Sequence, residues 1–285
     1  MNGLFLEIKF EGGLGNQLFQ YAAGRNLVAQ NNIPYFFLDI DSYKNQPLGR
    51  KFSLSNFQIK GMVLKNNFFR NAFRPQTKLN TAASFLSCHK FIKEKDTQLQ
   101  DIALQTGLLT TLDGYWQSEY YFKSIRQLLL AELVPKTMPL LPQWLNRQNT
   151  VGVHVRRTDY LYEPRYGFVG IDYYRRSIGI LKKKISNPQF VFFSDDIDWC
   201  KENFAGGDII FCEEHLWKED YLQLYLMSKC RHQVIANSSF SWWSAWLNSN
   251  NDKVVIRPLN PFKEKSLLYQ SHYPEEWITV DNDEH

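Results

Sequence analysis

The first half of the chain alternates apolar runs with a segment of helical periodicity. Residues 4–10 and 33–39 are apolar runs that predict strands, and residues 18–30 between them carry the spacing of a helix. Two strands joined by a helix within about 40 residues pair in parallel, because an antiparallel pair needs only a short turn. A further helix is predicted at residues 121–130. Residues 44–95 are polar and irregular, and no element is predicted there.

The alternation restarts after a cluster of prolines at Pro135, Pro139 and Pro142, which is typical of a domain boundary. Predicted strands in this half cover residues 151–155, 190–193, 209–211, 233–236 and 253–256, the last strand of the chain, and predicted helices cover 172–184, 219–229 and a segment that opens at 237–239. Strands that alternate with helices favour a parallel sheet. The predicted fold class is therefore α/β, with domains at residues 1–145 and 146–285 that face one another across a cleft.

Composition and charge narrow the function classes only modestly. The chain has 285 residues, a length that suits one large or two medium domains. Aromatic residues make up 15%, including eight Trp and fifteen Tyr; such rings suit a sugar-binding cleft and equally suit an aromatic core. The net charge of +4 does not indicate nucleic acid as a partner. A phosphate-bearing small substrate, or weak contact with an anionic membrane surface, fits this charge equally well.

The cysteines and the N-terminal segment point to a reducing compartment. The four cysteines are far apart in the sequence, at Cys88, Cys200, Cys212 and Cys230. This spacing favours neither disulfides nor a zinc site. The first strand carries Glu7 and Lys9, so it lacks the apolar core of a signal peptide. No stretch approaches the ~20 apolar residues of a membrane span. We expect a cytoplasmic protein, with peripheral membrane contact left open.

A glycine-rich turn separates the first predicted strand from the first predicted helix. Gly12, Gly13 and Gly15 allow the backbone to approach a ligand, and the helix start offers free amide donors. Asn16 and Gln17 follow, and their side-chain amides can donate to a sugar hydroxyl or a phosphate oxygen. A tight turn without a ligand is the simpler alternative.

The same turn partly matches a dinucleotide-binding fingerprint. Gly13 and Gly15 fit its first two glycines, but Leu18 stands where the third is required. Asp39, at the end of the second strand, lies near the place of a ribose-binding acid. A dinucleotide-dependent enzyme therefore stays open as a weaker alternative.

The run from His154 to Asp159 follows a buried strand and concentrates charge there. His154 and Arg156 project to one side of an extended segment, and Arg157 projects to the other. Guanidinium groups match phosphate oxygens with two parallel hydrogen bonds, so this pattern predicts a diphosphate held by Arg156. Arg157 is expected to turn back to a structural carboxylate, and Asp159 to steady an arginine or act in the chemistry. A surface cluster of ion pairs is the alternative.

Two acids, Asp195 and Asp196, follow the next strand. An acid at the carboxyl end of a parallel strand can accept hydrogen bonds from a guanine base or from ribose hydroxyls. The pair could also bind a divalent metal or cap the helix that follows.

A polar block precedes the last predicted helix. Asn237, Ser238 and Ser239 would cap that helix and present its amide groups to an anion. Phe240 belongs to the same block, and we expect it to contact the substrate as well. Together with Arg156, this helix start would hold a diphosphate from two sides. The sequence has no Asp-x-Asp pair on a loop between strands, so a mechanism without a metal is favoured.

Four blocks of the sequence, residues 12–22, 154–159, 193–196 and 236–243, resemble the α-1,2-fucosyltransferases of glycosyltransferase family 11. They occur in the order of that family and span nearly the whole chain. The Arg-Arg block is shared with α-1,6- and protein O-fucosyltransferases, so these linkages stay open. The glycine turn and the Ser-Ser-Phe-Ser-Trp-Trp block are more specific to α-1,2 transfer. Trp116 and Ser244 are small departures from the pattern.

The resemblance implies two Rossmann-like domains of the GT-B type. The C-terminal domain would bind GDP-β-L-fucose, and the N-terminal domain and the cleft would receive a β-galactoside. Transfer would invert the anomeric centre, with no metal and no other cofactor. The roles that it implies are guanosine binding for His154 and Asp195, β-phosphate binding for Arg156, phosphate binding for Ser238 and Ser239, and a position near the diphosphate for Asn16.

The general base is not identified by the resemblance. Asp159 is the first candidate and Glu163, on the following loop, is the second. A strongly dissociative reaction would need neither. A non-catalytic carbohydrate-binding module is a third alternative, resting on the aromatic content. The clustered Arg156 and Arg157 argue against it, because a neutral glycan needs no diphosphate site.

Overall fold

The chain forms two compact units, residues 1–134 and 135–285, which are described one at a time. The computed structural model describes residues 5–45, 50–64, 89–95, 99, 101–102, 109–138, 140–163, 166–213, 219–263 and 273–282. The units divide between Val134 and Pro135, before the boundary that the sequence predicts after residue 145. Pro135 therefore opens the second unit, and Pro139 lies outside the described residues.

The first unit contains a parallel five-stranded sheet of order β3-β2-β1-β5-β4. Its strands are β1 (Phe5–Lys9), β2 (Tyr35–Asp39), β3 (Met62–Leu64), β4 (His89–Lys93) and β5 (Leu109–Asp113). Its helices are α1 (Leu14–Asn31) and α3 (Arg126–Glu132), with 3-10 turns at η1 (Asp41–Asn45), η3 (Ser53–Asn56), η5 (Glu119–Tyr121) and η6 (Lys123–Ile125). The predicted strands β1 and β2 are confirmed.

Helix α1 begins at Leu14, four residues before the predicted start. The backbone amides of Asn16 and Gln17 donate to the Gly13 carbonyl oxygen at 3.0 and 3.1 Å, so both residues lie in the first helical turn. The glycines predict a longer loop, because glycine has a low helix propensity. Burial of Leu14 and Leu18 outweighs this effect, so the helix begins earlier.

The second unit contains a parallel six-stranded sheet of order β11-β10-β9-β6-β7-β8. Its strands are β6 (Thr150–Val155), β7 (Gln189–Ser194), β8 (Ile209–Phe211), β9 (His232–Val234), β10 (Val255–Pro258) and β11 (Ile278–Val280). Its helices are α4 (Ile171–Lys184), α5 (Ile197–Asn203), α6 (Asp220–Lys229) and α7 (Ser239–Leu247), with 3-10 turns at η7 (Gln143–Asn146) and η8 (Asp159–Leu161). The predicted α/β fold class with parallel sheets is confirmed in both units, whereas β11 shows that β10 is not the last strand.

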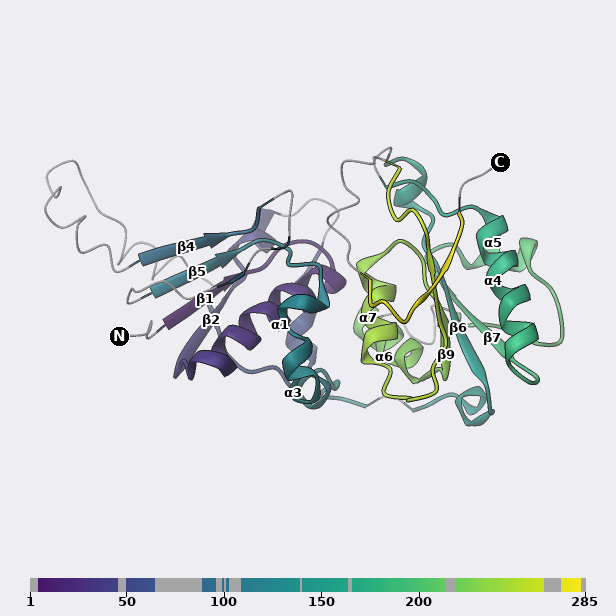
Figure 1. Cartoon of the computed structure of the whole chain (residues 1–285), viewed down its shortest axis with the longest axis horizontal. Coiled ribbons are helices and arrows are strands. Elements are labelled where there is room, and N and C mark those ends of the chain that lie inside the picture. Colours follow the sequence, from purple (N-terminus) through teal and green to yellow (C-terminus); the bar gives the residue numbers. More distant parts are fainter. Residues whose placement is uncertain are drawn as a thin grey trace, which may run out of the picture. The chain divides into compact units, whose positions relative to one another are not determined.

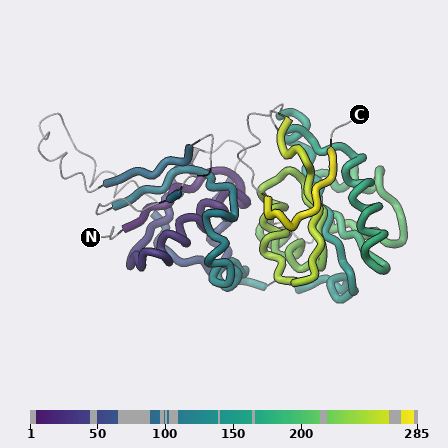
Figure 2. The backbone as a smooth tube through the Cα atoms, in the orientation of Figure 1, coloured from purple at the N-terminus to yellow at the C-terminus, as the bar shows by residue number. Residues whose placement is uncertain are grey.

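Helices cover both faces of the second sheet, with α4 and α5 on one face and α6 and α7 on the other (Figure 1). The same layers can be followed along the backbone tube (Figure 2). Strand β7 supplies both cores: Phe190 and Phe192 pack in the cluster that includes α4, whereas Val191 and Phe193 pack in the cluster that includes α6. This alternation follows from the two-residue period of a strand that is buried on both faces.

The structure bears on two predictions, one about the cysteines and one about membrane-spanning segments. Cys200, Cys212 and Cys230 are buried free thiols, and Cys88 lies outside the described residues. Within the described part of the chain, no helix is long and apolar enough to cross a membrane.

Candidate functional site

Three neighbouring strands of the second unit, β6, β7 and β9, bring the predicted residues to one edge of the sheet. The strands are parallel, with Val155 beside Ser194 and Val153 beside Val234, so their carboxyl ends lie together. Residues 156–159, 195–196 and 237–239 follow these ends directly. This is the edge at which open α/β sheets bind their ligands.

Arg156 lies at the centre of this edge between two carboxylates. Its guanidinium nitrogens lie 2.8 Å from the Asp159 carboxylate and 3.2 Å from the Asp195 carboxylate, and its charge lies over the Tyr160 ring at 5.6 Å. Burial disfavours the charge, but Asp195 and Asp159 outweigh burial, so the pKa of Arg156 is raised. The side chain keeps 31% of its surface exposed, which leaves the guanidinium within reach of a ligand.

Asp195 organises the turn that carries the arginines. Its carboxylate accepts from the backbone amides of Arg157 at 2.9 Å and Thr158 at 3.2 Å, and from the Thr158 hydroxyl. Both oxygens are therefore occupied within the loop. A guanosine contact through Asp195 stays a prediction, because an oxygen has two lone pairs and can accept a further hydrogen bond.

Arg157 points away from Arg156 and pairs with Asp196, 2.5 Å from one carboxylate oxygen. Its guanidinium also lies 4.9 Å from the Trp199 ring centre. The other Asp196 oxygen caps α5 by accepting from the Trp199 backbone amide at 3.2 Å. These contacts match the expectation that Arg157 turns back to a structural carboxylate and that Asp196 caps the following helix.

His154 is buried, with 6% of its surface exposed, and its ring centre lies 5.4 Å from that of Phe240. Burial lowers the pKa of His154 to about 4; the nearby Arg156 adds to this effect and Asp195 opposes it. The imidazole is therefore neutral near pH 7. It offers one donor and one acceptor to a neutral base rather than a positive charge to a phosphate.

The start of α7 has the capping geometry that the sequence predicts. The Ser238 hydroxyl accepts from the Phe240 backbone amide at 3.3 Å, and Ser239 opens the helix. Asn237 holds two loops in place: its side-chain amide donates to the carbonyl oxygens of Gly167 at 3.0 Å and Pro261 at 2.9 Å. The helix start is therefore fixed beside the loop of residues 166–169.

A pair of stacked tyrosines completes this edge and is not among the predicted site residues. Tyr160 lies under the Arg156 guanidinium, its ring centre lies 5.6 Å from that of Tyr166, and its hydroxyl lies 3.5 Å from the Asn237 carbonyl oxygen. Burial raises the pKa of Tyr160 to about 12, so its hydroxyl stays protonated. The signal in the sequence is its place four residues after Arg156, within the turn η8.

Four buried polar atoms at this edge have no hydrogen-bond partner among the described residues: His154 Nδ1, Arg157 Nε, Asp159 Oδ1 and Asn237 Oδ1. Buried polar atoms are normally paired, so their grouping here indicates a binding site. The two candidate bases lie on the same loop. Asp159 pairs with Arg156, and the Glu163 carbonyl oxygen accepts from the Gly167 amide at 3.0 Å.

In the first unit, the predicted residues surround the start of α1. Gly12 has a φ of +80°, which favours glycine, whereas Gly13 is extended and caps α1 and Gly15 is buried in the helix. The Asn16 side-chain oxygen accepts from the Gln117 amide at 2.9 Å.

Gln17 is built into the first unit by its side-chain hydrogen bonds. It is fully buried; its amide donates to the carbonyl oxygens of Gly12 and Lys51 and its oxygen accepts from the Leu54 amide. Both amide hydrogens are therefore used within the unit. Gln17 therefore holds residues 51–54 against the helix. Its contact with a ligand stays a prediction.

The family model described as "Glycosyl transferase family 11" matches residues 2–281. An α-1,2-colitosyltransferase of Escherichia coli is 32% identical over 96% of this chain and 98% of its own length. The O-antigen biosynthesis glycosyltransferase WbnK of Escherichia coli is 30% identical over 94% of this chain and 98% of its own. A galactoside α-(1,2)-fucosyltransferase 1 of Alouatta belzebul is 24% identical over 96% of this chain and 74% of its own.

Proposed function

The chain belongs to glycosyl transferase family 11, and from this premise we propose that it transfers L-fucose from GDP-β-L-fucose to the 2-hydroxyl of a terminal β-galactoside. The observation that carries the proposal is Arg156, which keeps 31% of its side-chain surface exposed at the sheet edge where α7 also begins. The relative named as a galactoside α-(1,2)-fucosyltransferase supports the donor, the acceptor and the linkage.

Arg156 and the α7 start suit a leaving diphosphate. As the fucosyl bond breaks, negative charge develops on GDP, and a guanidinium together with a helix start would stabilise it. Loss of one such donor typically costs ~3 kcal/mol of transition-state stabilisation. The ion pairs to Asp159 and Asp195 orient the Arg156 fork before the donor binds. This arrangement supports transfer without a metal or another cofactor.

His154 would bind the guanine base. A neutral imidazole with an unpartnered Nδ1 can donate to or accept from a base edge, and the neighbouring Phe240 ring offers an apolar surface. Ser238 and Ser239 would hold phosphate at the helix start, together with Arg156. These roles make one continuous donor site along the carboxyl ends of β6 and β9.

The acceptor hydroxyl would attack the face of the sugar opposite to GDP, which inverts the anomeric centre. Asp159 and Glu163 are the two proposed bases on the loop after β6. The pairing of Asp159 with Arg156 also supports a positioning role for Asp159. A general base contributes about 10²–10⁴-fold to such a step.

A second candidate function is α-1,2 transfer of colitose. It is favoured by the 32% identical relative that is named as a colitosyltransferase. The donor site described above contacts the nucleotide, so its residues do not separate the two sugars. Transfer by another fucosyl linkage is the remaining alternative.

The test is to incubate the protein with GDP-fucose and lactose in the presence of EDTA and to determine the product linkage by NMR. We expect fucosyl-lactose with an α-1,2 linkage, at a rate unchanged by the chelator. GDP-colitose in a parallel reaction decides between the two donors. An α-1,6 linkage, or activity that EDTA abolishes, would contradict the proposal.

A further inference from the structure

The loop of residues 114–118, directly after β5, has a backbone conformation that its sequence does not favour. Trp116 has a φ of +58°, in the left-handed region that is unusual for a bulky residue. Its indole is fully buried, and its ring centre lies 5.3 Å from that of Tyr121. Strained backbone persists only where the surrounding structure holds it, and it gathers at functional sites. The contacts that hold this loop, and the side chain that it presents, therefore bear on function.

Glu94 holds the loop from the neighbouring strand. It directly follows β4, which pairs with β5, and its backbone amide donates to the Asp113 carbonyl oxygen at 2.9 Å. One oxygen of its carboxylate accepts from the Tyr115 backbone amide at 2.6 Å, and the other accepts from that of Trp116 at 2.9 Å. Hydrogen bonds to an ionised group are among the strongest in proteins. They offset the cost of the left-handed Trp116 and fix the loop.

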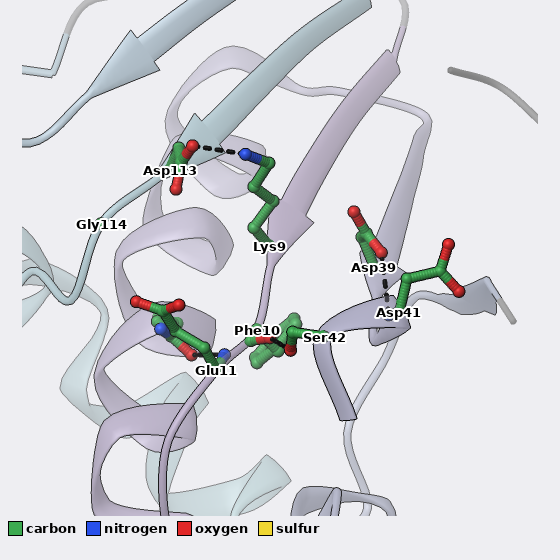
Figure 3. Close-up of a pocket in the computed structure, with 9 residues that line it drawn as sticks. Lys9, Phe10, Glu11, Asp39, Asp41, Ser42, Asp113 and Gly114 are labelled. Carbon is green, nitrogen blue, oxygen red and sulfur yellow. Dashed lines mark hydrogen bonds and ion pairs between the residues drawn. The ribbon is translucent and has the colours of Figure 1, made fainter. Parts of the chain in front are cut away.

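The loop begins at the carboxyl end of the first sheet, where α1 also starts. Asp113, the last residue of β5, pairs with Lys9, the last residue of β1 (Figure 3). These two residues and Gly114 line part of a cavity of about 340 Å³ at this end of the sheet. The carboxyl ends of parallel strands are the edge at which such sheets bind ligands.

Gln117 joins this loop to the first turn of α1. Its side-chain nitrogen Nε2 donates to the Asn16 side-chain oxygen at 2.9 Å. An asparagine amide carries an acceptor on one arm and a donor on the other, so this bond decides which arm points where. The Asn16 nitrogen Nδ2 takes the remaining arm and lies 2.6 Å from the position of a Cβ at Gly12. A side-chain donor is therefore presented at the glycine turn.

We propose that Gln117 is a positioning residue, which orients the Asn16 amide so that its nitrogen faces a substrate oxygen at the Gly12 turn. An amide nitrogen donates to a phosphate or hydroxyl oxygen, whereas an amide oxygen offers a phosphate no hydrogen bond. The inference rests on the proposed function, because it is the substrates of fucosyl transfer that supply this oxygen. Gln117 acts through Asn16 and needs no contact of its own with a substrate.

The experiment measures kcat and KM for transfer from GDP-fucose to lactose in the wild type, Gln117→Met and Gln117→Glu. Methionine keeps the length of the side chain and removes the donor, so we expect kcat/KM to fall about three- to tenfold, the effect of one hydrogen bond. Glutamate keeps the shape but accepts instead of donating, so the Asn16 nitrogen turns toward it and the oxygen faces the substrate. We expect a fall of about a hundredfold, as for a lost donor to a developing oxyanion.

Two controls separate orientation of Asn16 from a structural role and from charge. Gln127→Glu adds the same charge on an exposed residue of α3 and should leave kcat/KM unchanged. In an Asn16→Ala background, Gln117→Glu should change kcat/KM by less than about twofold, because residues that act as a unit are not additive. A loss of equal size with and without Asn16 overturns the proposal. A smaller loss in Gln117→Glu than in Gln117→Met, or an equal loss in Gln127→Glu, overturns it too.

NMR of the Asn16 side-chain amide separates this proposal from the proposed function. Its ¹⁵N–¹H signals are the ones that disappear in Asn16→Ala, and they report on the hydrogen bond without turnover. We expect Gln117→Met to shift these signals and Gln127→Glu to leave them in place. A shift in a wild type that transfers no fucose supports the orientation of Asn16 and contradicts the proposed function. Signals that stay unchanged in both Gln117 variants overturn the orientation, whether or not the wild type is active.

Discussion

At the residue scale, the two adjacent arginines have different environments. Arg156 is half-buried between Asp159 and Asp195, whereas Arg157 pairs with Asp196 and lies against Trp199. The alternation of side chains along an extended segment predicts this split. Because we propose only Arg156 for the diphosphate, the two positions should respond differently to substitution.

Arg156→Lys tests that assignment. Lysine keeps the charge but loses the planar fork that matches a phosphate bidentately, so we expect kcat for fucosyl transfer to fall about a hundredfold. Arg175→Lys is the control, because Arg175 is an exposed residue of α4. Equal rates for Arg156→Lys and the wild type would remove Arg156 from the donor site.

The lowered pKa of His154 predicts how the free energy of unfolding depends on pH. Its pKa is about 4 in the folded protein and about 6.5 in the unfolded chain, so the unfolded chain binds the proton first as pH falls. The contribution of His154 is therefore complete above about pH 6.5 and is lost as pH falls towards 4. Urea unfolding between pH 7 and 4.5 should show a shallower loss of unfolding free energy for His154→Phe than for the wild type. Equal slopes would show that His154 is not buried in its neutral form.

At the element scale, the second unit follows its sequence pattern closely and the first does so only in part. Strands β6 to β10 and helices α4, α6 and α7 lie where apolar runs and helical spacing place them, because each strand is apolar enough to stand out. Strand β4, with the sequence His-Lys-Phe-Ile-Lys, and the short strand β3 lack such a run, so pairing with their neighbours decides their structure.

The candidate site, too, could be predicted from the sequence only in part. Loop positions after strands predict Arg156 and Ser238, because parallel strands bring their carboxyl ends together. The stacking of Tyr160 on Tyr166 and the cavity beside Lys9 depend on how loops fold back. Sequence spacing does not encode that packing.

The Gly12 turn gives a prediction for a single element. Gly12 has a φ of +80°, and a Cβ there would lie 2.6 Å from the Asn16 side-chain nitrogen. Gly13, by contrast, has open space around its Cβ position. We expect Gly12→Ala to lower the free energy of unfolding by about 1–2 kcal/mol and Gly13→Ala to change it much less. Thermal or urea unfolding measures both, and equal losses would contradict the turn geometry.

At the scale of the whole molecule, each unit presents a different chemistry at the carboxyl edge of its parallel sheet. The second unit offers Arg156 and a helix start, which suit an anionic nucleotide. The first unit offers a cavity that is lined by one ammonium group, Lys9, and by the carboxylates of Glu11, Asp39, Asp41 and Asp113. The family model spans residues 2–281 and therefore includes both units.

The measurement that tests the donor site most directly is calorimetric titration of the wild-type protein with GDP in EDTA. We expect one GDP bound per chain, and much weaker binding of GMP because it lacks the β-phosphate assigned to Arg156. Absence of GDP binding, or binding of NAD in its place, would contradict the account and favour a dinucleotide-dependent enzyme.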